Sequence, residues 1–460
     1  MKPRYFIQTF GCQMNVHDSE RMAGMLDALG YAPTPAAEDA DVILMNTCAV
    51  REKPEHKLYS ELGILRQLKK VNPDLIIGVA GCMAQREADG IRKRVPEVDI
   101  LLGPRNLHHL PHLLRRAQHD GIGDGLDLEC DPTPATPVRR SSAVTAYVDI
   151  IFGCNFQCTY CAVPSARGKE VSRRPGEILD EIKQLCDLGY REITLLGQTV
   201  NAYGHDLEKL PDGTRCDFAW LLERINDINP SLRVRFTSPH PMYFNTRLIE
   251  TIASLPSVCE HLHLPLQSGD NDCLRRMNRT YTIEKYRAII DSIREKVPNV
   301  AVTTDAIVGF CGESEAEFQN TLRAFEEIQF DQAYMFAYSP RHSTEAWEWP
   351  DEVPPAVKQR RLAELIALHN DIAREKNRAL VGQSYEVLVE GLSEKSALRL
   401  AGRTRTNKLV LFPGDVQNYP PGSLVEVETC EGILKGFSGN VTRVIERSKA
   451  AKHVIELSVV

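Results

Sequence analysis

The sequence lacks the long apolar segments that would place a protein in or across a membrane. It contains no stretch of about 18 apolar residues, so it predicts no membrane-spanning helix. The N-terminal segment MKPRYFIQTFGC has too short an apolar run for a signal peptide. Thirteen cysteines without a secretion signal indicate a reducing compartment and thiol or metal chemistry rather than disulfides. We therefore expect a cytoplasmic protein without a membrane partner.

An excess of positive charge is also missing. The net charge of −7 argues against a strongly basic nucleic-acid binder, so any RNA contact must come from a local patch. The hydrophobic fraction of 43% and the charged fraction of 25% are typical of a globular protein. Because 460 residues exceed one ordinary core, we expect about two to four domains.

Three cysteines in the loop GCNFQCTYC lack a fourth metal ligand nearby. Cys154, Cys158 and Cys161 have the spacing C-x3-C-x2-C, which suits three corners of an iron–sulfur cluster. A [4Fe–4S] cluster normally takes four thiolates, so three leave one iron open, as in a catalytic metal site. The alternative is zinc, which normally takes four ligands; the next downstream candidates, Cys186 and His205, are distant in sequence.

This spacing, with Tyr160 before the last cysteine, resembles the radical S-adenosylmethionine (SAM) superfamily. The resemblance implies that SAM binds the open iron and that its reductive cleavage yields a 5′-deoxyadenosyl radical.

Three more cysteines each follow a predicted strand in the first hundred residues. Strands are expected at residues 5–10, 42–46 and 75–80, with helices at 18–29 and 56–71, which is an α/β pattern. Cys12, Cys48 and Cys82 come directly after these strands. The carboxyl ends of parallel strands meet at one edge of a sheet, so the three thiols should converge there.

The rest of the chain divides into a linker, a second α/β region and a β region. Residues 110–138 are rich in glycine and proline and predict a linker. From residue 143, about six strand–helix units suit a partial barrel rather than a full (β/α)8 barrel. A long helix is expected over 355–381. Short strands at 385–391, 409–414, 424–429 and 453–459 then predict a small β-barrel.

A basic strip precedes the second of these strands. Between residues 395 and 408 there are five basic residues and no acidic one: Lys395, Arg399, Arg403, Arg405 and Lys408. On an OB-like barrel this strip is typical of a nucleic-acid surface, and the alternative is an ordinary solvated face.

The three parts in this order resemble the methylthiotransferase family over nearly the whole chain. The resemblance implies an N-terminal methylthiotransferase domain (1–118), a linker (119–139), a partial (β/α)6 radical-SAM core (140–379) and a C-terminal TRAM barrel (380–450). It also implies that Cys12, Cys48 and Cys82 bind a second, auxiliary [4Fe–4S] cluster. The motif TFGCQMNVHDSE, with Gln13 and Met14, resembles the branch that acts on N6-dimethylallyladenosine in tRNA.

Further segments match the family and imply a SAM pocket. LLGQTVNAYG, RFTSPHP and LPLQSGDN place Gln198, Asn201 and Ser238 near the cofactor by resemblance. Backbone-satisfied polar residues at strand ends are the alternative. The chain departs from the family at Cys311, where a proline is usual, and at 342–344, where the arginine of YSPR is normally followed by glycine and threonine. We expect the first change to loosen a turn and the second to alter the substrate mouth.

The resemblance implies transfer of a methylthio group to C2 of the modified adenine. It further implies two SAM molecules per turnover, an external electron donor such as a flavodoxin or ferredoxin, the tRNA anticodon stem-loop as partner, and a monomer. The alternatives are a different substrate, either threonylcarbamoyl-adenosine in tRNA or an aspartate of a ribosomal protein, and a non-catalytic RNA-binding protein with structural metal sites.

Overall fold

The N-terminal third forms a parallel sheet covered by helices on both faces. The computed structural model describes residues 2–448 except 49–51, 120, 133–134 and 394–395. The sheet has the order β2-β1-β3-β4-β5-β6, with every neighbouring pair parallel. Its strands are β1 (Arg4–Phe10), β2 (Ala32–Pro33), β3 (Val42–Thr47), β4 (Ile76–Ala80), β5 (Ile100–Leu102) and β6 (Gly123–Gly125).

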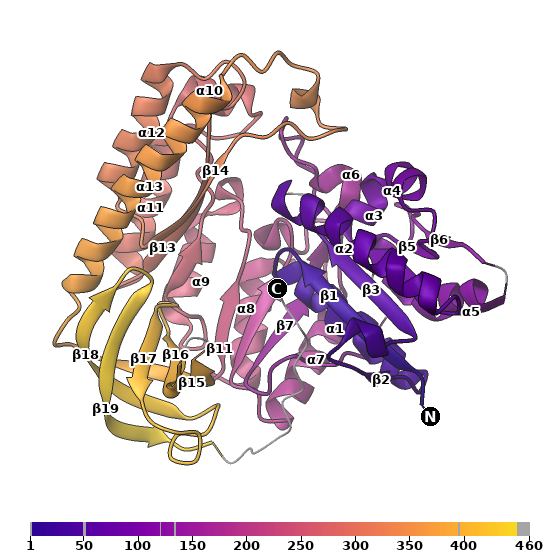
Figure 1. Cartoon of the computed structure of the whole chain (residues 1–460). Helices are drawn as coiled ribbons and strands as arrows, with labels where there is room; N and C mark the ends of the chain where they lie inside the picture. Colours follow the sequence, from indigo (N-terminus) through magenta and orange to yellow (C-terminus); the bar gives the residue numbers. More distant parts are fainter. Residues whose placement is uncertain (1, 49–51, 120, 133–134, 394–395, 449–460) are drawn as a thin grey trace.

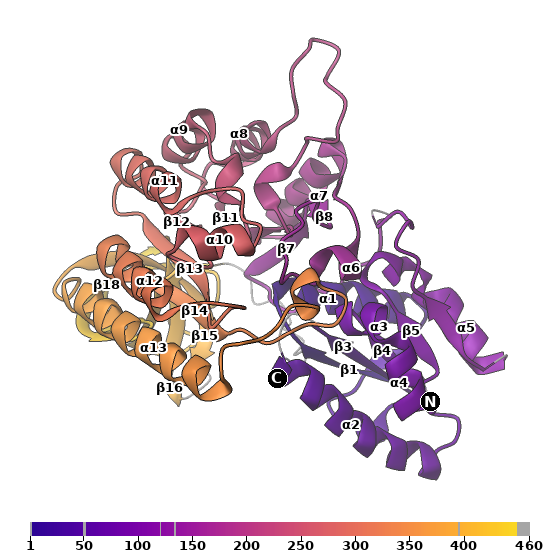
Figure 2. The same cartoon turned by 90° about the horizontal axis from the view of Figure 1, so that it is seen from above.

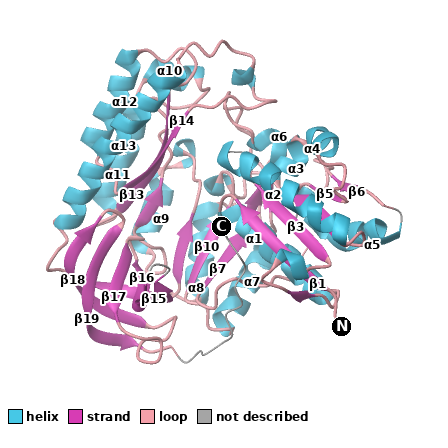
Figure 3. Cartoon of the chain, in the orientation of Figure 1, coloured by secondary structure: helices cyan, strands magenta, loops and turns pink. Residues whose placement is uncertain are grey.

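Helices lie against this sheet (Figure 3), and two apolar clusters attach them to it. One contains Met22, Leu26 and Leu113 and packs α1 (Gln13–Ala28) and α5 (Leu110–His119) on one face. The other contains Leu58, Leu62 and Met83 and packs the opposite helices. Those helices are α2 (Glu52–Val71), α3 (Cys82–Arg86) and α4 (Ala88–Arg94), and the short 3-10 helices of this part are η1 (Ala37–Asp39) and η2 (Pro104–His109).

The expected linker contains regular structure. Within residues 110–138 the chain forms α5 and then β6, which completes the N-terminal sheet beside β5. The prediction that this stretch is only a linker is therefore wrong. The strand was not predicted because glycines at 121, 123 and 125 are typical of a loop and the strand is only three residues long. The domain boundaries drawn from the sequence otherwise stay a prediction.

The central region is a partial barrel of six strands, as expected. Two three-stranded parallel sheets, β11-β10-β7 and β12-β13-β14, adjoin through contacts between β11 and β12. The strands are β7 (Thr145–Asp149), β10 (Glu192–Leu196), β11 (Arg233–Phe236), β12 (His261–His263), β13 (Ala301–Val308) and β14 (Gln332–Ala337), and the short pair β8 (Ile151–Phe152) and β9 (Val171–Ser172) lies outside this series.

Helices surround these strands, and the N-terminal domain lies beside the open side (Figure 2). The helices are α6 (Val163–Arg167), α7 (Pro175–Asp187), α8 (Phe218–Ile228), α9 (Thr246–Ser254), α10 (Asn271–Arg276), α11 (Ile283–Lys296), α12 (Glu315–Ile328) and α13 (Pro355–Arg378), with η3 (Val200–Ala202), η4 (Pro241–Tyr243) and η5 (Glu345–Trp347) between them. Their apolar faces join the strands in one buried core that includes Ile182, Leu222 and Phe325.

The C-terminal region is a closed five-stranded barrel, at the lower left of Figure 1. Its order is β15-β16-β17-β19-β18, around a core that includes Val387, Phe412 and Phe437. The strands are β15 (Ser384–Ser393), β16 (Ser396–Thr404), β17 (Leu409–Pro413), β18 (Leu424–Ile433) and β19 (Gly436–Glu446). The strand predicted at 453–459, and Lys395 of the basic strip, lie outside the described residues.

Much of the basic strip binds the central region instead of facing solvent. Arg405 pairs with Glu260 at 2.8 Å and donates to the carbonyl of Val258 at 2.7 Å. Lys408 pairs with Asp331 at 3.2 Å, while Arg403 pairs within the barrel with Glu390. From the opposite side, Arg233 and Arg235 donate to backbone carbonyls of residues 403–405. Two of the four described members, Arg405 and Lys408, therefore form interdomain contacts, while Arg399 is exposed.

This contact lies at the amino ends of the central strands. Glu192 and Arg233 are the first residues of β10 and β11, and Asp331 directly precedes β14. The carboxyl ends of the central strands lead into the cysteine loop, after β7 and β8, and into the predicted cofactor segments, after β10 and β11. Docking of the barrel thus leaves the carboxyl ends of the strands free, which is the side where ligands bind in parallel α/β folds.

We predict different effects for Arg405→Ala and Arg399→Ala. Loss of Arg405 leaves the carboxylate of Glu260 without its charged partner, which should cost about 1–3 kcal/mol of local stability. Amide hydrogen exchange of residues 256–260 and 403–408 should then accelerate by about tenfold or more, while affinity for an RNA probe falls only indirectly. Arg399→Ala should leave exchange unchanged and weaken RNA binding; equal exchange rates in both variants would contradict the interdomain role.

Candidate active site

Cys12, Cys48 and Cys82 converge at one edge of the N-terminal sheet, as predicted. They follow β1, β3 and β4, which are adjacent and parallel. The amide of Cys48 donates to the carbonyl of Phe10 at 2.8 Å, and the thiols of Cys12 and Cys48 lie within hydrogen-bonding reach. Cys12 is exposed, whereas Cys48 and Cys82 are buried. Three thiols from distant segments therefore share one site with an accessible side.

Gly11 and Asn15 shape the backbone next to these thiols. A Cβ on Gly11 would lie 2.4 Å from Asn15 Oδ1 and 2.8 Å from Cys48 Cβ, so no larger residue fits. Asn15 accepts from the amide of Cys12 at 3.3 Å and donates to Asn46 Oδ1 at 3.1 Å. These contacts begin α1 at Gln13, five residues before the predicted start at 18. The prediction missed this turn because Cys12 is an unusual residue at a helix N-cap.

Cys154, Cys158 and Cys161 lie in a loop that β8 and α6 enclose. The amide of Cys154 donates to the carbonyl of Gly168 at 3.1 Å, and the amide of Cys161 donates to that of Cys158 at 3.0 Å. Two side chains approach the sulfurs: Thr199 Oγ1 lies 3.2 Å from Cys154 Sγ, and Arg279 Nη1 donates to Cys158 Sγ at 3.3 Å. Two of the three sulfurs of the loop therefore have a polar side chain from a distant segment beside them.

Helix α6 connects the two cysteine groups. It begins two residues after Cys161 and spans five residues, which is a length of about 7.5 Å. Its last residue, Arg167, forms a buried ion pair with Asp18 of α1 at 2.7 Å. The charge of Arg167 also lowers the pKa of both Cys12 and Cys82, although burial keeps the pKa of Cys82 raised overall. One side chain of the central region therefore reaches the thiols of the N-terminal domain.

The donor groups of both cysteine triads are thiols. Among the described residues, the donor groups within 4.8 Å of one another are His108/His109/Cys130 and Asp270/Asp272/Glu317. Neither cysteine triad is one of them. The donor sets thus suit thiolate-bound iron–sulfur clusters, which take soft ligands.

The three residues predicted near SAM differ in their surroundings. Gln198 has a buried amide whose Oε1 and Nε2 have no partner among the described residues. The side chain of Asn201 is occupied, since it accepts from the amide of His240 at 2.8 Å and donates to its carbonyl at 3.0 Å. Ser238 has a φ of 57°, a backbone conformation that is strained for a residue other than glycine. Gln198 is therefore the most available of the three for a ligand.

Sequence reasoning missed several residues around the loop. The ring of His240 stacks on Phe156 at 3.9 Å, and its buried Nε2 has no partner in the described part of the chain. Burial and the nearby Arg279 lower the pKa of His240 to about 2, so the ring is neutral. His240 lies in the quoted segment RFTSPHP, which was the available signal. Thr199 likewise lies in the quoted segment LLGQTVNAYG, whereas no sequence signal marked Arg279 or Arg167 as neighbours of cysteines.

Both departures from the family pattern, Cys311 and residues 342–344, contact other parts of the chain. Cys311 is 4% exposed and packs with Phe310 and Tyr338. The amide of Glu313 donates to the carbonyl of Phe310 at 2.8 Å across this turn, and the expected loosening stays a prediction. Ser343 accepts from Arg86 of α3 at 3.2 Å, so this loop connects the central region to the helix that starts at Cys82.

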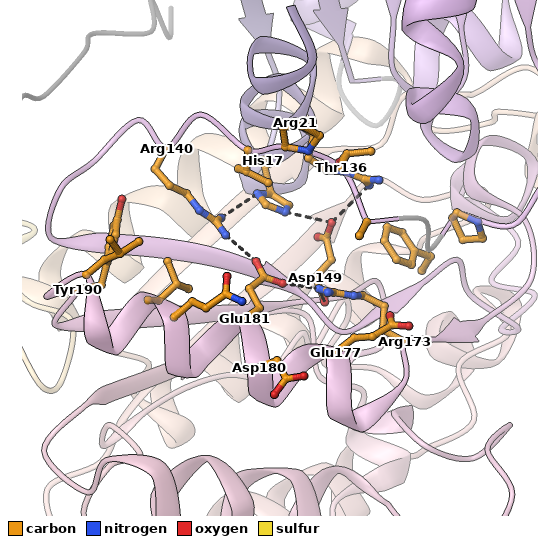
Figure 4. Close-up of a pocket in the computed structure, with 18 residues that line it drawn as sticks. His17, Arg21, Thr136, Arg140, Asp149, Arg173, Glu177, Asp180, Glu181 and Tyr190 are labelled. Carbon is orange, nitrogen blue, oxygen red and sulfur yellow. Dashed lines mark hydrogen bonds and ion pairs between the residues drawn. The ribbon is translucent and has the colours of Figure 1, made fainter. Parts of the chain in front are cut away.

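A cavity of about 500 Å³ lies between α1 and α7 (Figure 4). His17 bridges Arg140 and Asp149, and Glu181 bridges Arg140 and Arg173. Its lining includes none of the six predicted cluster cysteines among the described residues. The cavity is therefore separate from the thiol sites, and its ion pairs join the two domains.

Three family descriptions match successive parts of the chain. Residues 4–103 match the Uncharacterized protein family UPF0004, residues 148–325 match the Radical SAM superfamily, and residues 378–429 match the TRAM domain. The second match contains all three cysteines of the loop. As a radical SAM protein, the chain binds a [4Fe–4S] cluster and SAM.

Curated relatives align over nearly the full length. The chain is 49% identical over 437 residues to the tRNA-2-methylthio-N(6)-dimethylallyladenosine synthase of Moorella thermoacetica, covering 94% of this chain and 97% of the relative. It is 46% identical over 439 residues to the synthase of Carboxydothermus hydrogenoformans, covering 95% and 98%. This chain belongs to that synthase family. The resemblance to methylthiotransferases seen in the sequence is thereby confirmed, as are the enzyme class and the fold class.

Solved structures with a similar fold include a radical SAM methyltransferase. TsrM from Kitasatospora setae, with cobalamin and a [4Fe–4S] cluster bound, matches with a TM-score of 0.55 and 12% identity, over 75% of this chain and 77% of TsrM. At this identity the likeness concerns the fold alone. None of the described helices of the synthase-family chain is long and apolar enough to cross a membrane.

We predict that Cys12 in the iron-free chain reacts at unusually low pH. Hydrogen bonding with Cys48, with help from Arg167, lowers the pKa of Cys12 to about 6, so the nucleophilic thiolate exists above pH 6 and disappears below it. Alkylation of Cys12 by iodoacetamide, followed by peptide mass spectrometry, should be half-maximal near this pH. Arg167→Met should raise the midpoint by about one unit, whereas Arg167→Lys keeps the charge and should not. An unchanged midpoint in Arg167→Met would exclude the link.

Proposed function

We propose that the protein transfers a methylthio group to C2 of N6-dimethylallyladenosine in tRNA. The observation that carries the proposal is the position of α6, which begins beside the cysteine loop and whose last residue, Arg167, reaches Asp18 and the thiols of Cys12 and Cys82. Relatives at 46–49% identity are named for this product, and both triads are present in this chain. A reaction that joins hydrogen abstraction to sulfur insertion needs two reactive centres close to one substrate atom.

The two triads are assigned to two clusters. Cys154, Cys158 and Cys161 would bind the [4Fe–4S] cluster that meets SAM, and Cys12, Cys48 and Cys82 would bind an auxiliary [4Fe–4S] cluster. Bound there, the clusters and two SAM molecules per turnover supply the one-electron chemistry, the methyl group and the sulfur. The protein's own task is to place the substrate base between the triads and to exclude water.

The inner face of the partial barrel is suited to receive that base. On β13, Thr304, Ala306 and Val308 are buried against the helices, so Asp305 faces inward. Asp305 pairs with His263 at 3.3 Å, and Tyr334, its neighbour on β14, is 45% exposed. An accessible aromatic ring beside hydrogen-bonding groups is the usual combination for binding a flipped base.

The C-terminal barrel is assigned to the anticodon stem-loop. Since Arg405 and Lys408 are occupied by the central region, RNA contact falls to other exposed residues, such as Arg399 and Leu398 on β16. An external flavodoxin or ferredoxin would supply electrons, and the protein would act as a cytoplasmic monomer.

The decisive experiment compares tRNA nucleosides. In a deletion strain the 2-methylthio nucleoside of dimethylallyladenosine should be absent by mass spectrometry and return on complementation. Loss of a methylthio group from threonylcarbamoyl-adenosine or from a ribosomal protein, with the dimethylallyladenosine product intact, would overturn the substrate assignment.

Cysteine variants should separate the two triads. Cys154→Ala should abolish formation of 5′-deoxyadenosine from SAM, because the first cluster loses a ligand. Cys12→Ala should leave that cleavage intact but stop methylthiolation, and Cys430→Ala, an exposed thiol in the barrel, is the matched control. Full methylthiolation by the Cys12 variant would refute the role of the N-terminal triad.

Gln198→Ala should affect the binding of SAM, whereas Asn201→Ala should affect the stability of the protein. Gln198→Ala should raise the KM for SAM about tenfold or more, since a buried hydrogen-bonding group is lost, and leave the SAM-free protein as stable as before because its amide has no partner. Asn201→Ala should lower the free energy of unfolding by about 1–3 kcal/mol through the unpaired backbone of His240. Unfolding curves with and without SAM distinguish the two; a stability loss in Gln198→Ala alone would contradict the assignment.

A further inference from the structure

Two histidines and a cysteine outside both triads form a compact donor group. His108 and His109 end η2, and Cys130 lies in the segment after β6. Cys130 Sγ is 3.6 Å from His108 Nε2 and 3.7 Å from His109 Nε2, and the three donor atoms all lie within 4.8 Å of one another. The proposed reaction uses none of these residues.

These separations fit a tetrahedral zinc ion. With Zn–S of about 2.3 Å and Zn–N of about 2.0–2.1 Å, a tetrahedral angle puts the sulfur and nitrogen about 3.6 Å apart. Both observed S···N distances agree with this value. We propose that His108, His109 and Cys130 bind one Zn²⁺ ion.

Hydrogen bonds hold the two segments of the proposed site together in the absence of a metal ion. Arg105, on the same 3-10 helix as the histidines, donates to the carbonyl of Cys130 at 2.9 Å. Asn106 donates to the carbonyl of Asp127 at 2.9 Å. The segment that carries the cysteine is thus held against the helix that carries the histidines, so binding requires little ordering of the chain.

The donor set selects the class of metal. Two imidazoles and one thiolate suit Zn²⁺, whereas Mg²⁺ and Ca²⁺ require oxygen ligands. The thiol proton of Cys130 passes to solvent when the ion binds.

Zinc here would stiffen the connection between the domains. Arg105 also donates to the carbonyls of Arg167 and Lys169, both at 3.0 Å. The same side chain therefore links the proposed zinc site to the end of α6, where Arg167 meets Asp18. Three protein ligands leave the fourth tetrahedral position to a water molecule, and the site is independent of the cluster cysteines.

Metal analysis of the full-length protein tests the site. The chain is reconstituted anaerobically with iron and sulfide, supplied with zinc sulfate and desalted, and zinc and iron are measured by mass spectrometry. Wild type and Cys430→Ala should retain about one zinc per chain, whereas Cys130→Ala and His108→Ala should lose it with unchanged iron. Equal zinc in wild type and Cys130→Ala would assign the ion to other thiols and overturn the proposal.

X-ray absorption at the zinc edge tests the ligands in the wild type, without any variant. One sulfur at about 2.3 Å with nitrogen ligands at about 2.0–2.1 Å is expected. A shell of three or four sulfurs would place zinc on a cluster triad and refute the site. Because neither readout depends on methylthiolation, this result is independent of the proposed reaction.

Discussion

The buried ion pair between Arg167 and Asp18 sets the geometry on which the proposed chemistry depends. Both side chains are nearly inaccessible, at 5% and 1% exposure, and 149 residues separate them in sequence. Removing one partner from such a pair leaves an uncompensated buried charge, which typically costs about 3–5 kcal/mol. The relative position of α1 and α6 is therefore strongly constrained. Since α1 begins beside Cys12 and α6 begins beside Cys161, the constraint extends to both cysteine groups.

The contacts that hold the C-terminal barrel and the residues of the candidate active site lie at opposite ends of the central strands. At their amino ends, Arg233, Arg235 and Arg405 join the C-terminal barrel to the core through charged groups and backbone carbonyls. Their carboxyl ends are left to the cysteine loop, Gln198 and His240. Parallel α/β folds use this division because loops at the carboxyl ends can vary without disturbing the sheet. A barrel fixed at the far end can hold a long substrate while its base enters from the other side.

Errors in the sequence predictions had both distant and local causes. The basic strip around Arg405 suggested an RNA surface because its acidic partners, Glu260 and Asp331, precede it by more than 70 residues. The helix of residues 13–28 was predicted too short because a cysteine and an asparagine begin it. Strand β6 was missed because three residues carry too little periodicity. By contrast, the strand ends before Cys12, Cys48 and Cys82 were predictable, since apolar strands stop abruptly there.

The sequence by itself determined that cysteine thiols are the candidate metal ligands and that they form two triads. It also determined the order of the three folded parts. These features are local: spacing within a loop and alternation along a strand do not depend on the rest of the chain. Only the tertiary structure decided which side chains meet the thiols, namely Thr199 at Cys154, Arg279 at Cys158 and Arg167 near Cys12. It also brought Cys130 to His108 and His109. Such contacts arise when separate elements pack, and packing distances are not encoded in any short stretch of sequence.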